Sequence, residues 1–294
     1  MRSFVLRIFV TALAALVNPA AGDVPAVNAE LEAGYTDMYN LQFDAAHAAF
    51  KQYEQANPED AMGPVSDAAA YLFFELDRMK ILRSDFFVEN HTLLNSKKVP
   101  PNPEVKKQFE AALAKAKQLA EARLQKSPGD HNALLANVLG TALHANYEAL
   151  IGKQYWQALT EIKEAQVLAE QLLRVCPDCH DADLAGGVEN YLLSQKMAAE
   201  RWLLRLTGAQ TDKQAGIEKL RTVAEKGLYL KPYAKILLAI AALRDNNKAE
   251  AKELLAELAG KFPRNDLFRE ELKKLSSGSG CCGCRTPGSC APDR

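Results

Sequence analysis

The sequence predicts an all-α protein, a right-handed superhelical solenoid built from helical hairpins. Its main evidence is a four-residue turn, with proline second, that recurs between amphipathic stretches. Proline has no amide hydrogen and its ring clashes with the preceding helical turn, so each copy ends one helix and opens the next. A plain helical bundle is the alternative. The four turns are Asn57-Pro58-Glu59-Asp60, Ser127-Pro128-Gly129-Asp130, Cys176-Pro177-Asp178-Cys179 and Phe262-Pro263-Arg264-Asn265.

Residues 1–22 have the features of a signal peptide. Arg2 and Arg7 supply a positive region, and residues 8–17 form an apolar run that is short for a bilayer span. Ala20-Ala21-Gly22 offers the small residues that a signal peptidase needs, which predicts cleavage before Asp23. We therefore expect a periplasmic or secreted protein, with a membrane-anchored N-terminus as the alternative.

Charge and hydropathy exclude two classes of partner. Loss of Arg2 and Arg7 with the signal peptide takes the 36 basic residues to 34 against 37 acidic ones, a formal net charge of −3. Such a balance, with both signs interleaved, argues against a nucleic-acid binder. No later apolar run is long enough for a membrane span after signal cleavage. The predicted domains are a solenoid over residues 23–275 and a tail over 276–294.

The first and last hairpins share one spacing of small and large residues. The small residues let two helices approach closely, and the large residue fills the space beside them. In chain order the matched positions are Gly34, Ala46, Phe50 and Pro58 in the first hairpin, and Ala239, Ala251, Leu255 and Pro263 in the last. This spacing resembles that of the tetratricopeptide repeat (TPR) family, which implies a stack of hairpins that bind other molecules.

Longer helices are expected between these two hairpins, over residues 103–126, 131–151, 154–175, 181–206 and 212–226. Turns are expected at Gly152-Lys153 and at Asn246-Asn247, and residues 84–103 form one long irregular connection. The segment from Arg201 to Gly208, followed by Gly216-Ile217-Glu218-Lys219-Leu220, is similar to exported bacterial TPR proteins of unassigned function. It is also distantly similar to a eukaryotic TPR family linked to inclusion-body clearance.

The TPR resemblance implies a protein or peptide partner, held in a concave groove lined by the first helix of each hairpin. Tyrosine and methionine suit such a groove, because they offer large or adaptable contact area. The alternative is that these residues pack against the next hairpin. The implied groove residues are Leu31, Tyr35, Met38, Asn137, Thr141, His144, Tyr233, Ile236 and Ile240.

No enzyme motif is present, so we expect no catalysis, no catalytic residue, no cofactor and no metal. The chain lacks a glycine-rich phosphate loop after a strand, a nucleophile elbow and a pair of histidines at zinc spacing. Its five histidines, at positions 47, 91, 131, 144 and 180, are scattered. The interleaved acidic and basic residues are typical of solvated helix faces.

The segment from Cys176 through Cys179 to His180 matches the Cys-x-x-Cys-His pattern that attaches c-type haem. A haem or thiol redox protein is therefore the alternative function. We predict that this segment carries no haem, because the turn from Ser127 to Asp130 has the same proline and is followed by His131 without any cysteine. A local disulfide, a redox pair and two unpaired thiols remain open for the cysteines.

The tail begins with the flexible linker Ser276-Ser277-Gly278-Ser279-Gly280. It continues into four further cysteines, Cys281, Cys282, Cys284 and Cys290, in a stretch without apolar residues to build a core. Disulfides within the tail, or to a partner, are favoured over a Cu(I) or zinc site, because adjacent cysteines fit tetrahedral geometry poorly.

Overall fold

A computed structural model describes residues 28–82, 99–194 and 212–277 of the chain. These ranges contain eleven α-helices, packed as sequential antiparallel pairs, and no strand, so the all-α prediction is confirmed. A π-helix, η1 (Glu148–Gly152), and a 3-10 helix, η2 (His180–Ala182), complete them. The α-helices are α1 (Ala29–Tyr39), α2 (Phe43–Ala56), α3 (Met62–Arg78), α6 (Pro103–Lys126), α7 (His131–Tyr147), α8 (Tyr155–Val175), α9 (Asp183–Ser194), α11 (Lys213–Lys226), α12 (Lys231–Arg244), α13 (Lys248–Lys261) and α14 (Asp266–Ser277).

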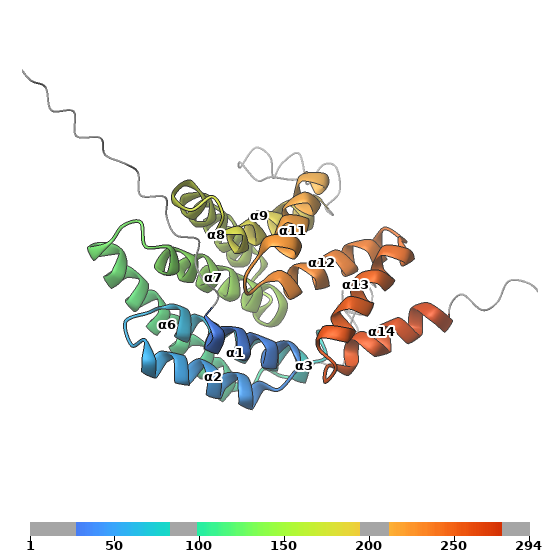
Figure 1. Cartoon of the computed structure of the whole chain (residues 1–294), viewed down its shortest axis with the longest axis horizontal. Helices are drawn as coiled ribbons and strands as arrows, with labels where there is room; N and C mark the ends of the chain where they lie inside the picture. The colour runs from blue at the N-terminus through green and yellow to red at the C-terminus, as the bar shows by residue number, and fades with distance from the viewer. Residues whose placement is uncertain (1–27, 83–98, 195–211, 278–294) are drawn as a thin grey trace, which may run out of the picture.

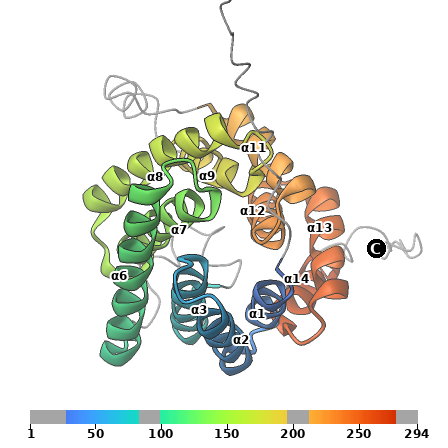
Figure 2. The same cartoon turned by 60° about the vertical axis from the view of Figure 1, so that its left-hand side comes forward.

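The helices are arranged around a ring, with one member of most pairs inside and the other outside (Figure 2). Helices α1, α3, α7, α9 and α12 face the centre, while α2, α6, α8, α11 and α13 lie around them. The end of the described chain, helices α13 and α14 in Figure 1, returns to its start, so that the turn between α13 and α14 lies beside the end of α1 (Figure 2). No helix within the described ranges combines the length and apolar character that a bilayer crossing requires.

The close helix approach predicted for the first hairpin is present. Gly34 and Phe50 are both buried, and a Cβ atom added to Gly34 would lie 2.4 Å from Cε1 of the Phe50 ring. In the last hairpin Ala239 and Leu255 occupy the matching positions and are also buried. The middle hairpin differs, since a Cβ on Gly140 would make only an ordinary contact, 3.8 Å from Leu113. Glycine is therefore a packing requirement at position 34 and not at position 140.

The four proline turns share one backbone pattern. In each, the first residue donates its amide N–H to the carbonyl four positions earlier, at 2.8 Å. The fourth residue then donates its N–H to the carbonyl of the first, at 3.0–3.1 Å. The pairs that close the turns are Asp60 with Asn57, Asp130 with Ser127, Cys179 with Cys176, and Asn265 with Phe262. The predicted role of these turns, to end one helix and open the next, is confirmed.

The middle of the chain follows the predicted boundaries with two differences. The helix expected over residues 131–151 changes at Glu148 from α-helix to the π-helix η1, before the predicted turn at Lys153, whose φ is 59°. The helix expected from Asp181 begins with the short 3-10 helix η2. The predicted turn at Asn246 is present, with φ 58°. Most of the irregular connection over 84–103, and the segment 201–208, lie outside the described residues.

Contacts between distant parts of the sequence close the ring. The aromatic rings of Tyr39 and Phe262 have centroids 5.4 Å apart. The backbone carbonyl of Tyr39 accepts a hydrogen bond from the Asn265 side chain at 2.9 Å. The Asn28 N–H donates to the hydroxyl of Tyr229 at 3.1 Å. The hydroxyl of Tyr39 donates to the Tyr229 carbonyl at 3.3 Å. The first hairpin is thus held by residues about 190–230 positions later.

Candidate functional site: inner cavities and a cysteine pair

Two adjacent apolar cavities open on the inside of the ring. Their volumes are about 50 and 40 Å³, and the inner helices α1, α3, α7, α9 and α12 supply most of their walls. Apolar side chains from helices remote in sequence meet here because the ring brings them together. The residues that line both cavities are Leu139, Ala142, Asn146, Leu184, Leu230 and Tyr233.

Two larger hollows lie on polar parts of the surface, with volumes of about 310 and 260 Å³. The first contains the ion pairs Lys213–Asp245 and Arg221–Glu250. The second contains the ion pair Arg123–Asp130. The charges within these ion pairs neutralise one another, whereas Glu59 and Asp60, which also line the second hollow, make that hollow acidic.

Among the described residues that line the inner cavities, Asp181 is the only carboxylate, and its oxygen atoms stabilise the fold. It is buried, and burial raises its pKa, an effect opposed by hydrogen bonds from three backbone N–H groups. Its Oδ1 accepts from Leu228 at 3.0 Å and Leu230 at 3.3 Å, and its Oδ2 accepts from Tyr229 at 2.9 Å. Asp181 therefore fixes the turn before α12, so its lone pairs are used by the backbone.

The expected groove residues of the first hairpin belong to the protein core. Leu31, Tyr35 and Met38 are 1–3% exposed. The Tyr35 ring stacks on that of Tyr229 at 5.1 Å, and burial raises its pKa well above the ordinary tyrosine range. Tyr35 and Met38 also contribute to the wall of the larger cavity. The sequence leaves open whether Leu31, Tyr35 and Met38 line a groove or pack inside the protein, and in the structure all three pack inside it.

The remaining groove candidates are half-buried. On α7, Asn137 and Thr141 lie in this class with His144, whose Nδ1 is 2.8 Å from Oε2 of Glu161 on α8. On α12, Tyr233 lines both cavities, and burial raises its pKa to about 12. Ile236 and Ile240 are also half-buried. Of the nine candidates, Tyr35, Met38 and Tyr233 are thus the ones that line the inner cavities.

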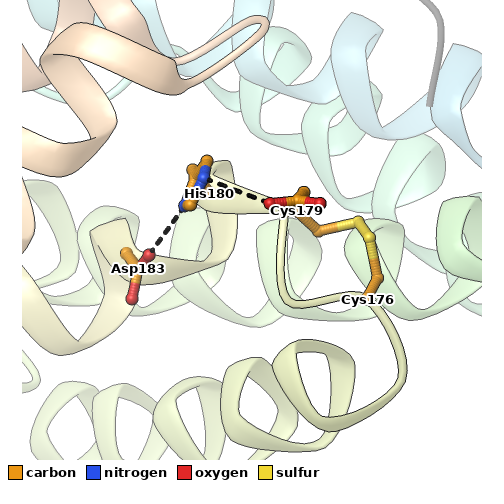
Figure 3. The surroundings of a disulfide bond; sticks show 5 residues. Cys176, Cys179, His180 and Asp183 are labelled. Atoms are coloured by element: carbon orange, nitrogen blue, oxygen red, sulfur yellow. Dashed lines mark ion pairs between the residues drawn. A yellow bond between two sulfur atoms is a disulfide. The ribbon is translucent and has the colours of Figure 1, made fainter. Parts of the chain in front are cut away.

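Cys176 and Cys179 form a disulfide, buried at the turn between α8 and α9 (Figure 3). Of the three states left open by the sequence, the structure contains this one. Each sulfur atom is bonded to the other and so is not available for a bond to haem. His180 points away from the sulfur atoms, toward Asp183 (Figure 3). Its Nδ1 lies 3.5 Å from Oδ2 of Asp183 and its Nε2 3.9 Å from Oδ1 of Asp178.

Among the described residues, His131 lies beside the cysteine pair. One of its ring nitrogens and the sulfur atoms of Cys176 and Cys179 all lie within 4.8 Å of one another. His131 begins α7, directly after the neighbouring proline turn. The sequence does contain a signal, because His131 and His180 follow equivalent turns, but it does not show which histidine faces the sulfur atoms. The tail cysteines Cys281, Cys282, Cys284 and Cys290 lie outside the described residues.

Searches against protein-family models, curated proteins and solved structures found no match to this chain. The structure itself shows an all-helical protein of stacked helix pairs.

Proposed function

We propose that this chain is an exported scaffold of TPR type, a right-handed superhelical solenoid that binds a protein or peptide in its concave groove and catalyses no reaction. The observation that carries the proposal is the pair of apolar cavities on the inside of the ring. Their walls come from the inner helix of successive pairs, which is where the TPR resemblance locates a partner. Residues 1–22 support export, since they have the composition of a signal peptide.

The size of the cavities favours a protein or peptide over a small molecule. Sites for small ligands enclose about 300–1,000 Å³, several times the 50 and 40 Å³ found here. Cavities of this size suit the apolar side chains of a larger partner. The wall residue Tyr233, which is half-buried, supplies a rigid contact surface for such side chains.

Site-specific photocrosslinking in the source organism tests this proposal. A benzophenone amino acid replaces Asn146, which is half-buried and lines both cavities, and in a matched control it replaces Val167 on α8, which is 62% exposed. We expect a discrete crosslinked partner from position 146 and none from position 167. Equal yields from both positions, or adducts from 167 alone, would place the partner elsewhere and contradict the proposal.

A second experiment tests whether a charge placed in the groove weakens partner binding. Leu143 lines the larger cavity and is half-buried, so Leu143→Arg puts a charge where we expect apolar side chains to bind. Val167→Arg is the matched control, because it adds the same charge on an exposed surface. We expect Leu143→Arg to weaken partner binding at least tenfold and Val167→Arg to leave it unchanged, once circular dichroism shows the same helix content in both.

Thiol redox chemistry of Cys176 and Cys179 is a second candidate function, favoured by the disulfide between them. A pair that works in electron transfer must be reducible by its cellular partners. Equilibration with glutathione buffers, followed by alkylation and mass spectrometry, measures the reduction potential of this pair. A potential below about −300 mV, the range of structural disulfides, would rule this function out.

A further inference from the structure

Two proline turns meet around the disulfide and bring three potential metal ligands together. Cys176 and Cys179 close the turn between α8 and α9, and His131 follows the turn between α6 and α7. The two sulfur atoms and a His131 ring nitrogen lie within 4.8 Å of one another. The cysteines are 4% and 6% exposed and His131 is half-buried, so the cluster is open to solvent on the histidine side.

Among residues 28–82, 99–194 and 212–277, the His131 side chain has no polar partner outside this cluster. Within the described part of the chain, no side-chain hydrogen bond or ion pair engages its ring. The adjacent carboxylate of Asp130 is occupied, since its Oδ1 accepts from the Ala133 N–H at 3.0 Å and its Oδ2 from Arg123 at 2.6 Å. His180 points away from the sulfur atoms and is not a member of the cluster. The imidazole of His131 is therefore free to serve as a ligand.

We propose that Cys176, Cys179 and His131 bind a zinc ion when the disulfide is reduced, so that the disulfide controls access to a Cys₂His metal site. In the first step a dithiol reductant donates two electrons and two protons. The S–S bond breaks, two cysteine thiols form and the dithiol becomes a disulfide. In the second step Zn²⁺ binds the two sulfurs as thiolates, which releases two protons, together with one neutral imidazole nitrogen.

The geometry needed for zinc lies close to the one observed. Zn–S bonds of about 2.3 Å and a Zn–N bond of about 2.0 Å at tetrahedral angles separate two sulfurs by about 3.8 Å, and sulfur from nitrogen by about 3.5 Å. After reduction the two sulfurs must move apart, which side-chain rotation achieves while the Cα atoms stay about 5.4 Å apart. Two residues between the cysteines is also the pair spacing of many zinc sites. Water completes the fourth position on the open side.

Metal titration of the full chain tests this site. The four tail cysteines are changed to serine in every sample, so that Cys176 and Cys179 carry the only thiols. A phosphine reduces the disulfide, with water supplying two protons and the oxygen of the phosphine oxide. Anaerobic titration with Co²⁺, and then displacement by Zn²⁺, follows the thiolate-to-cobalt absorption band. We expect one cobalt ion per reduced chain and none in the oxidised protein.

Two histidine variants form the matched comparison. We expect His131→Ala to weaken cobalt binding about tenfold or more. His180 also follows a proline turn but lies outside the cluster, so His180→Ala should change cobalt binding less than about twofold. Cys179→Ser should abolish the absorption band. If His131→Ala loses helix content, His131→Gln replaces it, because glutamine keeps the size and polarity of the side chain.

Zinc protection of the thiols supplies a second readout. In the reduced parent protein, zinc should slow the alkylation of Cys176 and Cys179 at least tenfold relative to the rate without zinc. In His131→Ala, zinc should leave the alkylation rate unchanged. Three results would overturn the proposal. These are no cobalt bound to the reduced parent, equal affinity in His131→Ala, or a loss in His180→Ala as large as in His131→Ala.

Discussion

Two neighbouring turns share a backbone and differ in the side chains that close them. At residues 127–130 the fourth residue, Asp130, caps α7 by accepting the Ala133 N–H at 3.0 Å. At residues 176–179 the fourth residue is Cys179, which makes no cap and is instead bonded to the first residue, Cys176. The backbone hydrogen bonds therefore define the turn, while its fourth position can hold either a helix cap or a covalent link.

The other two turns belong to the capped class. Asp60 accepts the Met62 N–H at 2.8 Å, and Asn265 accepts the Leu267 N–H at 3.1 Å. Asp60 has the largest number of roles, because its Oδ2 also accepts from the Tyr53 hydroxyl at 2.8 Å and from the Asn132 side chain at 3.0 Å. It thereby joins the first proline turn to the start of α7. The cost of replacing the fourth residue should therefore differ between turns.

The largest effect is expected for Asp60→Ala. It removes a helix cap, worth about 0.5–2 kcal/mol, and leaves the hydroxyl of the buried Tyr53 without its acceptor, at about 1–3 kcal/mol. We expect the free energy of unfolding to fall by about 2–4 kcal/mol, measured by urea denaturation. In a Tyr53→Phe background the loss should shrink by at least about 0.5 kcal/mol. An undiminished loss would show that the Tyr53 bond adds nothing to the cap.

The second effect is loss of the disulfide in the double variant Cys176→Ser, Cys179→Ser. The closed loop is short, and loop entropy then predicts a loss of about 2 kcal/mol, smaller than for the long loops that disulfides usually close. We expect the double variant to melt several degrees below the oxidised parent protein. Its melting temperature should equal that of the reduced parent within error. If reductant left the melting temperature of the parent unchanged, the disulfide would contribute no stability to a turn that its backbone hydrogen bonds already hold.

The turns can be predicted from the sequence, whereas the closure of the ring cannot. The turns follow from proline and from neighbours within four residues, so their positions are correct, and so is the close approach of Gly34 to Phe50. The closure of the ring could not be predicted, because the bond from Asn28 to Tyr229 depends on the accumulated twist of every hairpin between them. For that reason the sequence leaves open whether Tyr35 lines a groove or packs inside the protein, and the structure places it in the core.

The cysteine site shows the same division. The sequence limits Cys176 and Cys179 to a few chemical states, and the disulfide is one of them. It does not show whether His131 or His180 lies beside them, since both histidines follow equivalent proline turns. The structure instead places His131 beside the sulfur atoms, which requires two turns from different hairpins to stack. The spacing of residues within one segment cannot predict which residues of a neighbouring hairpin lie beside it.

A smaller effect is expected for Asp130→Ala. It removes the cap of α7, at about 1 kcal/mol, while the accompanying ion pair with the exposed Arg123 contributes little. Asp130→Asn is the matched control, since the amide oxygen can still accept the Ala133 N–H. We expect Asp130→Ala to lower the free energy of unfolding in urea and Asp130→Asn to leave it nearly unchanged. Equal losses in both would assign the stabilisation to the charge and not to the cap.

The smallest effect is expected from converting the cysteine turn into a capped one. In the background Cys176→Ser, the variants Cys179→Ser and Cys179→Asp differ only in the side chain of the fourth residue. Both side chains can cap, but the carboxylate also interacts favourably with the start of the helical segment that runs from η2 into α9, which adds about 0.3–1 kcal/mol. We expect Cys179→Asp to be the more stable of the two by that amount, and the difference to decrease as sodium chloride screens the charge. Matched urea denaturation curves at low and high salt measure it. If Cys179→Asp were the less stable variant, the burial of position 179 would outweigh any cap, and the cysteine turn would lie outside the rule that the other three obey.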